Sequence, residues 1–189
     1  MIVVRNAVPI EVCNHIAATL LIKEFSGALV EDKHQVVGSN IAYGAPSCEA
    51  LLLSLHSTME KETGLKLIPT YSFARIYRQG DALAKHTDRP ACEISATLTL
   101  WYTGINKWLV YGDGEGVDLK AGDMLIYQGC DMEHWREPLD KGVWVQLFLH
   151  YVNAEGEHKD QAFDGRKDLA DLYATLKEFC FDAGDLQKV

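Results

Sequence analysis

Long apolar runs are missing from this sequence. No stretch approaches the roughly 18 consecutive apolar residues that a membrane-spanning helix needs. The first 25 residues also lack the apolar segment of a secretory signal peptide, because Glu11, Cys13 and His15 interrupt it. We therefore expect a cytoplasmic protein without a membrane segment.

Cysteine is scarce and shows no pairing pattern. Five cysteines are spread over 189 residues, and none of them belongs to a C-x-x-C pair. An odd, dispersed set in a chain without an export signal is typical of reduced, buried thiols. A disulfide framework or a cysteine-based zinc site is therefore not expected.

Positive charge is also in short supply. Eighteen lysines and arginines stand against 27 aspartates and glutamates, so the formal net charge is −9. A phosphate-binding face needs clustered cations, which this chain does not show. Nucleic acid is therefore not expected as a partner, and an anionic membrane surface is disfavoured for the same reason.

The sequence does contain enough apolar material for one compact core. Hydrophobic residues make up 48% of the chain and charged residues 24%, and no repeat, low-complexity tract or linker divides it. We predict a single domain over residues 1–189. It has a helical part over 1–66, a β-rich part over about 67–153 and a closing helix over about 166–180.

Helical spacing marks the N-terminal third. Apolar residues recur at helical spacing from Pro9 to about Phe25, behind a proline at a plausible first turn. A second helix is predicted to begin at Ser47 and to end at Gly64. The polar segment between them, residues 31–46, has no clear period. It is predicted to be a long loop, and such loops are often functional.

Short β-like runs separated by Gly, Asp and Pro fill the centre of the chain. Many short strands at close spacing favour a sandwich or a jelly-roll barrel. We predict strands at Tyr71–Arg78, Glu93–Tyr102, Trp108–Tyr111, Met124–Tyr127, Met132–Glu137 and Val143–Val152. The predicted fold class is therefore α+β, with a jelly-roll core.

His86 and Asp88 are separated by one residue. On a strand both side chains would leave the same face. A neutral imidazole and a carboxylate that converge form two thirds of the 2-His-1-carboxylate triad that binds non-haem Fe(II). The third ligand must come from another strand, and His134 is the best candidate. A lone H-x-D match is, however, more often a pair of surface or capping residues near a turn.

Three blocks of sequence around His86, Asp88 and His134 make the H-x-D match more specific. They read YSFARIYRQGDALAKHTDRPACEISATLTL, AGDMLIYQGCDMEHWREPL and VWVQLFLHYVN. Over about residues 69–153 the chain resembles the Fe(II)/2-oxoglutarate-dependent oxygenases, specifically their prolyl 4-hydroxylase-like branch. The resemblance implies a double-stranded β-helix with N-terminal helices packed on one sheet, followed by a C-terminal helix.

The same resemblance implies an activity. It makes His86, Asp88 and His134 the ligands of Fe(II), with 2-oxoglutarate and O2 as co-substrates. It implies a dioxygenase that hydroxylates an aliphatic carbon and releases succinate and CO2. The substrate would be a small molecule or a peptide, such as a free amino acid or a prolyl peptide.

Three further residues are implied as contacts of 2-oxoglutarate. Tyr77 matches a family tyrosine whose hydroxyl commonly contacts this co-substrate. Arg75, two residues earlier on the same strand, would share its face. Thr97 takes the place of a residue that lines the barrel, although plain β-propensity explains a threonine there equally well.

One part of the family pattern is missing. Most relatives place an Arg or Lys on the last barrel strand, where it pairs with the distal carboxylate of 2-oxoglutarate. This chain has Trp144 and Gln146 there. Because an unpaired buried carboxylate is costly, another cation is expected to take this role.

Arg136 is the favoured substitute, followed by Arg75. Arg136 lies two residues after His134, so on a continuous strand it faces the barrel interior, and a planar guanidinium suits a carboxylate. Arg136 could instead form a structural ion pair with Glu93 or Glu137.

Two other functions remain open at this point. A cupin-like metalloenzyme would use the same barrel without 2-oxoglutarate, although cupins usually carry H-x-H followed by Glu. Here only Glu93 could substitute for that acid. A non-catalytic barrel that binds a small ligand is the other alternative, and the unusual stretch around Gln146 keeps it open.

Overall fold

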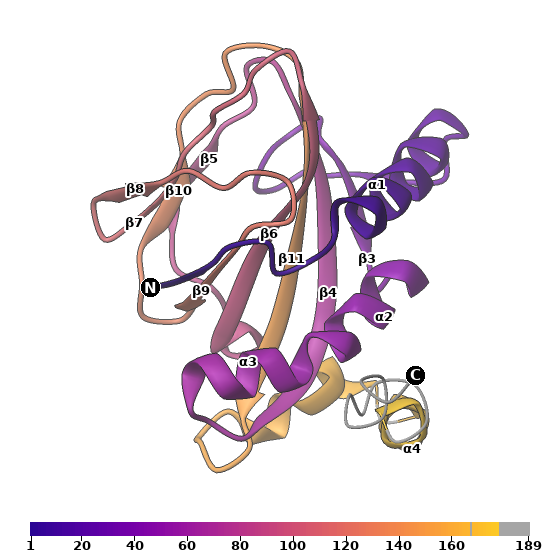
Figure 1. Cartoon of the computed structure of the whole chain (residues 1–189), viewed down its shortest axis with the longest axis vertical. Coiled ribbons are helices and arrows are strands. Elements are labelled where there is room, and N and C mark those ends of the chain that lie inside the picture. Colours follow the sequence, from indigo (N-terminus) through magenta and orange to yellow (C-terminus); the bar gives the residue numbers. More distant parts are fainter. Residues whose placement is uncertain (167, 178–189) are drawn as a thin grey trace.

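Three helices from the N-terminal part pack on one face of a large antiparallel sheet (Figure 1). The computed structural model describes residues 1–166 and 168–177. The three helices are α1 (Ile10–Phe25), α2 (Pro46–Ser54) and α3 (His56–Thr63), and α4 (Leu169–Leu176) follows the last strand. Within the described part of the chain, no helix is long and apolar enough to cross a membrane.

The described strands form two antiparallel sheets. The larger sheet has the order β1 (Ile2–Val4), β9 (Met124–Gln128), β6 (Ile94–Thr103), β11 (Val143–Asn153), β4 (Leu67–Arg78), β3 (Asn40–Tyr43) and β2 (Val30–Glu31). The smaller sheet has the order β5 (Leu83–His86), β10 (His134–Arg136), β7 (Val110–Gly112) and β8 (Glu115–Val117). Figure 1 shows the smaller sheet on the side of the larger sheet that faces away from α1 and α2. The predicted jelly-roll core with helices on one sheet is confirmed.

The central strands β4, β6 and β11 are buried on both faces. Ile76, Leu98 and Leu147 pack with Leu20 and Met59 in the core between the sheet and the helices. Because side chains alternate along a strand, the residues between these apolar positions point into the space between the two sheets. That interior carries aromatic and polar side chains, and the candidate site is built there.

The N-terminal helices follow the sequence pattern closely. The predicted helix from Pro9 to Phe25 is confirmed as α1. The predicted second helix is interrupted at Leu55, which separates α2 from α3, and it ends at Gly64. Gly64 has a φ of 71°, a left-handed conformation that glycine adopts without steric cost.

The prediction of an unstructured segment over 31–46 is wrong in part. Asn40–Tyr43 forms β3, which pairs with β4, and Val30–Glu31 forms the edge strand β2. Pairing along one edge of a sheet depends on the neighbouring strand, so it leaves little trace in the local pattern. Between β2 and β3, residues 32–39 form a short loop.

The six predicted strands are present with shifted ends. Besides β2 and β3, three further short strands among the described residues were not predicted, namely β1, β5 and β8, each of three or four residues. The predicted C-terminal helix over 166–180 corresponds to α4. Positions 167 and 178–180 lie outside the described residues.

The described cysteines fit the expectation of reduced thiols. Cys13, Cys48 and Cys92 are buried and Cys130 is half-buried, and all four are free. Burial raises the pKa of the Cys92 thiol to about 12, so it stays protonated at neutral pH.

Candidate metal centre

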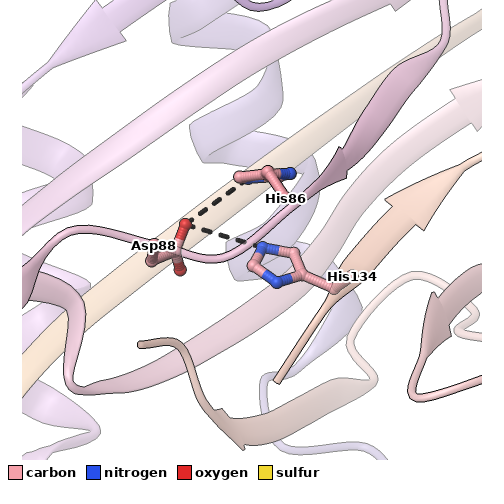
Figure 2. A group of neighbouring side chains, drawn as sticks. All are labelled: His86, Asp88 and His134. Carbon is pink, nitrogen blue, oxygen red and sulfur yellow. Dashed lines mark ion pairs between the residues drawn. The ribbon is translucent and has the colours of Figure 1, made fainter. Parts of the chain in front are cut away.

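The three predicted metal ligands come together where β5 meets β10 (Figure 2). His86 ends β5 and His134 begins β10, and these two residues lie opposite each other in the antiparallel pair. Asp88 follows β5 after one intervening residue. Its backbone N–H donates to the carbonyl of Gly129 at 2.8 Å, which holds the aspartate beside the end of β9.

The side chains of the triad converge on one point. Oδ1 of Asp88 lies 3.5 Å from Nε2 of His86 and 3.5 Å from Nε2 of His134. The ligand atoms of all three residues lie within 4.8 Å of one another. His134 is buried, whereas His86 and Asp88 are half-buried. The donor atoms are therefore shielded but remain within reach of the surface.

Backbone carbonyls fix the orientation of both imidazoles. Nδ1–H of His86 donates to the carbonyl of Ala84 at 2.9 Å, and Nδ1–H of His134 donates to the carbonyl of Met132 at 3.0 Å. Each ring then carries a lone pair on Nε2, the nitrogen that faces Asp88. These acceptors are main-chain atoms, so no side-chain pattern in the sequence could have identified them.

The carboxyl group of Asp88 is the third potential ligand, beside the Nε2 atoms of His86 and His134. Burial alone would raise its pKa, but hydrogen bonds from His134 and His86, in the forms of these rings that carry a proton on Nε2, outweigh burial and hold the pKa well below its usual range. Without those protons, two imidazole lone pairs and a carboxylate repel one another unless a cation lies between them. This donor set fits a divalent transition metal that keeps further coordination positions open.

A cavity of about 280 Å³ lies against the triad. Besides the triad, its wall includes Tyr71, Phe73, Arg75, Leu83, Tyr127 and Phe148. Of the four residues predicted to contact 2-oxoglutarate, only Arg75 lines this cavity. Tyr77, Thr97 and Arg136 lie in the barrel interior but are not part of its wall.

Arg75 already has an acidic partner. Its Nη2 donates to Asp32 at 2.6 Å and to Oε1 of Gln35 at 2.9 Å, and its Nη1 donates to the hydroxyl of Tyr77 at 3.4 Å. Both Arg75 and Asp32 are buried. The charge of this arginine is therefore largely balanced by the loop between β2 and β3. No pattern in the sequence indicates this pairing.

Thr97 is engaged within the barrel wall. Its hydroxyl accepts a hydrogen bond from Nε2 of Gln146 at 2.6 Å, and Oε1 of Gln146 accepts from Trp144 at 2.8 Å. Gln146 also accepts from the hydroxyl of Thr99 at 3.2 Å. Trp144 and Gln146, which stand where most relatives have a cation, thus form their side-chain hydrogen bonds with each other and with the two threonines.

Arg136 is a buried cation without an acidic partner among the described residues. Its Nη1 donates to the carbonyl of Trp108 at 2.9 Å, whereas its Nη2 has no partner in the described part of the chain. Burial lowers the pKa of Arg136 to about 10, so the group is still charged at neutral pH. Its guanidinium carbon lies 4.4 Å from the ring centre of Trp108 and 5.8 Å from that of Trp144.

The alternative ion pairs of Arg136 do not form. Glu93 accepts from the backbone N–H of Asn153 at 2.9 Å, and Glu137 accepts from the indole N–H of Trp135 at 3.1 Å. Arg136 instead reaches from β10 to Trp144, the residue on β11 where the family cation was expected. A buried, unpaired guanidinium is costly, so this position favours an anionic ligand.

Because Gly129 has no side chain, the carboxylate of Asp88 can lie directly against its backbone. A Cβ at this position would lie 2.7 Å from Oδ2 of Asp88 and 2.3 Å from the carbonyl oxygen of Cys92. We expect Gly129→Ala to displace Asp88 and to weaken metal binding roughly 10- to 100-fold, as other changes that disturb ligand orientation do. Titration with Mn(II), followed by electron paramagnetic resonance, measures this loss.

Gly80→Ala is the control for general destabilisation. Gly80 has a φ of 91° and nothing within 4 Å of its Cβ position, so alanine there strains the backbone without touching the site. Both variants should unfold at lower temperature than the wild-type protein. Equal metal affinities in the two variants would contradict the role given to Gly129.

His150 is a buried neighbour of the site on β11. Its Nδ1 lies 2.8 Å from the hydroxyl oxygen of Ser95, and its ring lies 4.6 Å from that of Tyr71. These contacts make His150 a hydrogen-bonded histidine of the core. The same side chain also lines the cavity.

Protonation of His150 should destabilise the fold. Burial lowers its pKa to about 4. The unfolded chain has a value of about 6.5, so the stabilising effect of the neutral form is complete above pH 6.5 and is lost as the pH falls toward 4. Between pH 7 and pH 5 the wild-type protein should lose about 2 kcal/mol more unfolding free energy than His150→Phe. Urea unfolding at both pH values measures the difference, and parallel losses would contradict it.

Comparisons with known proteins were made at the level of sequence and of structure. No family model and no curated protein matches this chain. Solved structures do match. A prolyl-4-hydroxylase from Pseudomonas putida has a TM-score of 0.63 at 17% identity, over 80% of this chain and 91% of that one.

Two further structures extend this likeness. The non-heme alpha-ketoglutarate-dependent epimerase SnoN from nogalamycin biosynthesis has a TM-score of 0.67 at 12% identity, over 81% of this chain and 78% of that one. The viral collagen prolyl hydroxylase from Paramecium Bursaria Chlorella virus-1, solved as a 2OG complex, has a TM-score of 0.62 at 10% identity, over 79% of this chain and 94% of that one. The chain therefore has the jelly-roll fold of the prolyl hydroxylases and other 2-oxoglutarate- and iron-dependent oxygenases.

Proposed function

We propose that this protein is an Fe(II)- and 2-oxoglutarate-dependent dioxygenase. One observation carries the proposal: the Nε2 atoms of His86 and His134 and the carboxylate of Asp88 meet at one point, with both Nδ1–H groups bonded to backbone carbonyls. Such a face of two imidazoles and one carboxylate is the usual protein contribution to a non-haem Fe(II) centre. The fold likeness to oxygenases of this kind supports the same function.

The proposed binding site for the distal carboxylate of 2-oxoglutarate is Arg136. The free Nη2 of this buried guanidinium supports the assignment, because a carboxylate would supply its missing partner. Leu83 both lines the metal cavity and packs in the cluster that contains Tyr77, Trp108 and Trp144. Leu83 therefore links the wall of the metal cavity to the cluster in which the guanidinium of Arg136 lies against Trp108.

The protein residues position and shield the reacting groups. When bound, Fe(II) together with 2-oxoglutarate supplies the oxidation of a substrate carbon by O2, with release of succinate and CO2. Ala84 and Met132 keep both imidazoles in the tautomer that offers Nε2, and the environment of Asp88 keeps its carboxyl ionised. The aromatic wall limits the access of water to this point.

The proposed substrate group is uncharged and aliphatic. Phe73 and Phe148 present aromatic rings to the cavity. The two arginines on the cavity wall already have acidic partners, since Arg75 pairs with Asp32 and Arg89 forms two hydrogen bonds with Asp164. A prolyl ring of a peptide, or the side chain of a free amino acid, suits such a wall.

A cupin-like centre receives less support from the site. The acid that such a centre would need, Glu93, is hydrogen-bonded to Asn153 and does not line the cavity. The non-catalytic alternative predicts that the protein does not consume 2-oxoglutarate.

Turnover of 2-oxoglutarate tests the proposal directly. We expect Fe(II)-loaded protein in air to convert 2-oxoglutarate to succinate, measured by proton NMR, and to do so faster with a suitable prolyl peptide or amino acid. Asp88→Asn, which retains the size of the side chain, is the matched control and should be inactive. Equal succinate formation by wild-type and Asp88→Asn protein would refute the proposed centre.

A further inference from the structure

We propose that the side chain of Gln35, in the loop between β2 and β3, competes with the metal for His86 and so lowers the metal affinity of the site. The proposal rests on the metal centre proposed above. Gln35 belongs to the loop of residues 32–39, on the exposed side of the cavity, and its side chain lines the cavity together with the triad.

The amide of Gln35 bridges two residues of the site. Its Nε2 lies 2.8 Å from Nε2 of His86, and its Oε1 accepts from Nη2 of Arg75 at 2.9 Å. The arginine can only donate, so the amide oxygen must face Arg75 and the amide nitrogen must face His86. With Nδ1–H of His86 donated to Ala84, the amide nitrogen donates to the lone pair on Nε2.

That lone pair is the one that the metal needs. A neutral imidazole has a single acceptor nitrogen, and it cannot bind an N–H group and a metal ion at the same time. Metal binding at His86 therefore requires the amide of Gln35 to move away. The hydrogen bond that Gln35 loses opposes metal binding by the free energy of that bond.

The backbone of the loop is held independently of Gln35. The carboxylate of Asp32 accepts backbone N–H groups from His34, Gln35 and Val36 at 2.8, 3.2 and 3.0 Å, and it also pairs with Arg75. Val36 is buried in the cluster around Tyr77. Gln35 itself is exposed, so its side chain can rotate away from His86 while Asp32 and Val36 keep the loop in place.

Removal of the amide should tighten metal binding. One hydrogen bond of this kind corresponds to a change of roughly 3- to 10-fold in an equilibrium constant. We expect Gln35→Leu, which keeps most of the volume, and Gln35→Ala to lower the Kd for Mn(II) by that factor. The readout is the electron paramagnetic resonance signal of free Mn(II). Lys33→Ala, an exposed change in the same loop, is the control and should bind as the wild-type protein does.

A second measurement follows the amide itself. Zn(II) is diamagnetic, so the side-chain NH2 resonances of the wild-type protein can be recorded before and after its addition. The Gln35 signal, assigned by its loss in Gln35→Leu, should shift, whereas that of Gln161, which does not line the cavity, should not.

The outcomes separate this inference from the proposed function. Unchanged or weaker Mn(II) binding by both Gln35 variants, while His86→Ala abolishes binding, would overturn the competition and leave the metal centre intact. Wild-type binding by His86→Ala would overturn the metal centre itself.

Discussion

Replacement of His134 by alanine should lower the affinity for a divalent metal by at least about 100-fold. Disturbing a residue that merely orients a ligand already costs 10- to 100-fold, so loss of a ligand is expected to cost more. His134 is buried and contributes the ligand from β10, whereas His86 and Asp88 come from β5 and the segment after it. Mn(II) titration of both proteins measures the loss.

The design of this experiment must separate ligation from folding. His134→Gln retains more of the buried volume than alanine and should lose metal affinity to a similar extent. His15→Ala, on the exposed face of α1, is a control for the histidine content of the chain. Retention of wild-type affinity in a folded His134→Ala protein would mean that β10 contributes no ligand.

Arg136→Ala should weaken the binding of 2-oxoglutarate to the metal-loaded protein by about 100-fold. A charge-assisted bond to a carboxylate in a buried site is among the stronger interactions, and the variant would leave the carboxylate unpaired. Metal affinity should change little, because the Arg136 side chain forms no hydrogen bond or ion pair with the three residues of the triad. Isothermal titration of 2-oxoglutarate into Zn(II)-loaded protein measures the effect without turnover.

Two matched variants sharpen this test. Arg136→Lys keeps the charge but not the planar fork, so it should recover only part of the affinity. Arg78→Ala removes an exposed arginine, paired with Glu24, from β4 and should have no effect. Wild-type affinity in Arg136→Ala, together with loss of binding in Arg75→Ala, would mean that Arg75 binds the distal carboxylate of 2-oxoglutarate.

The convergence of His86, Asp88 and His134 could be predicted in part because strand geometry repeats. The one-residue spacing of His86 and Asp88 indicated a common face, and the resemblance supplied His134. The alternation of side chains along a strand does not, however, explain the position of Asp88. Asp88 lies beyond the end of β5, and the carbonyl of Gly129, together with the space above that glycine, holds it in position.

The environment of the arginines could not be predicted. Asp32 lies 43 positions before Arg75, in a segment without periodicity, and only the pairing of β3 with β4 brings the two together. Gln35 reaches His86 for the same reason. Such long-range polar contacts depend on the completed fold and leave no local signal in the sequence.

The position of Arg136 was anticipated, but its partners were not. Alternation after His134 placed its side chain in the interior, as observed. The acids weighed as partners, Glu93 and Glu137, are held by Asn153 and Trp135 instead. Which acid meets which base depends on side-chain directions at strand ends, where regular spacing no longer applies.

Anaerobic absorption spectroscopy tests the central claim most directly. The protein is titrated first with Fe(II) and then with 2-oxoglutarate, beside His134→Gln protein as the control. The account predicts a weak visible charge-transfer band that requires both additions and is missing from the variant. Binding of Fe(II) by the wild-type protein with no band on addition of 2-oxoglutarate would contradict it, because the co-substrate would then not be bound at the metal.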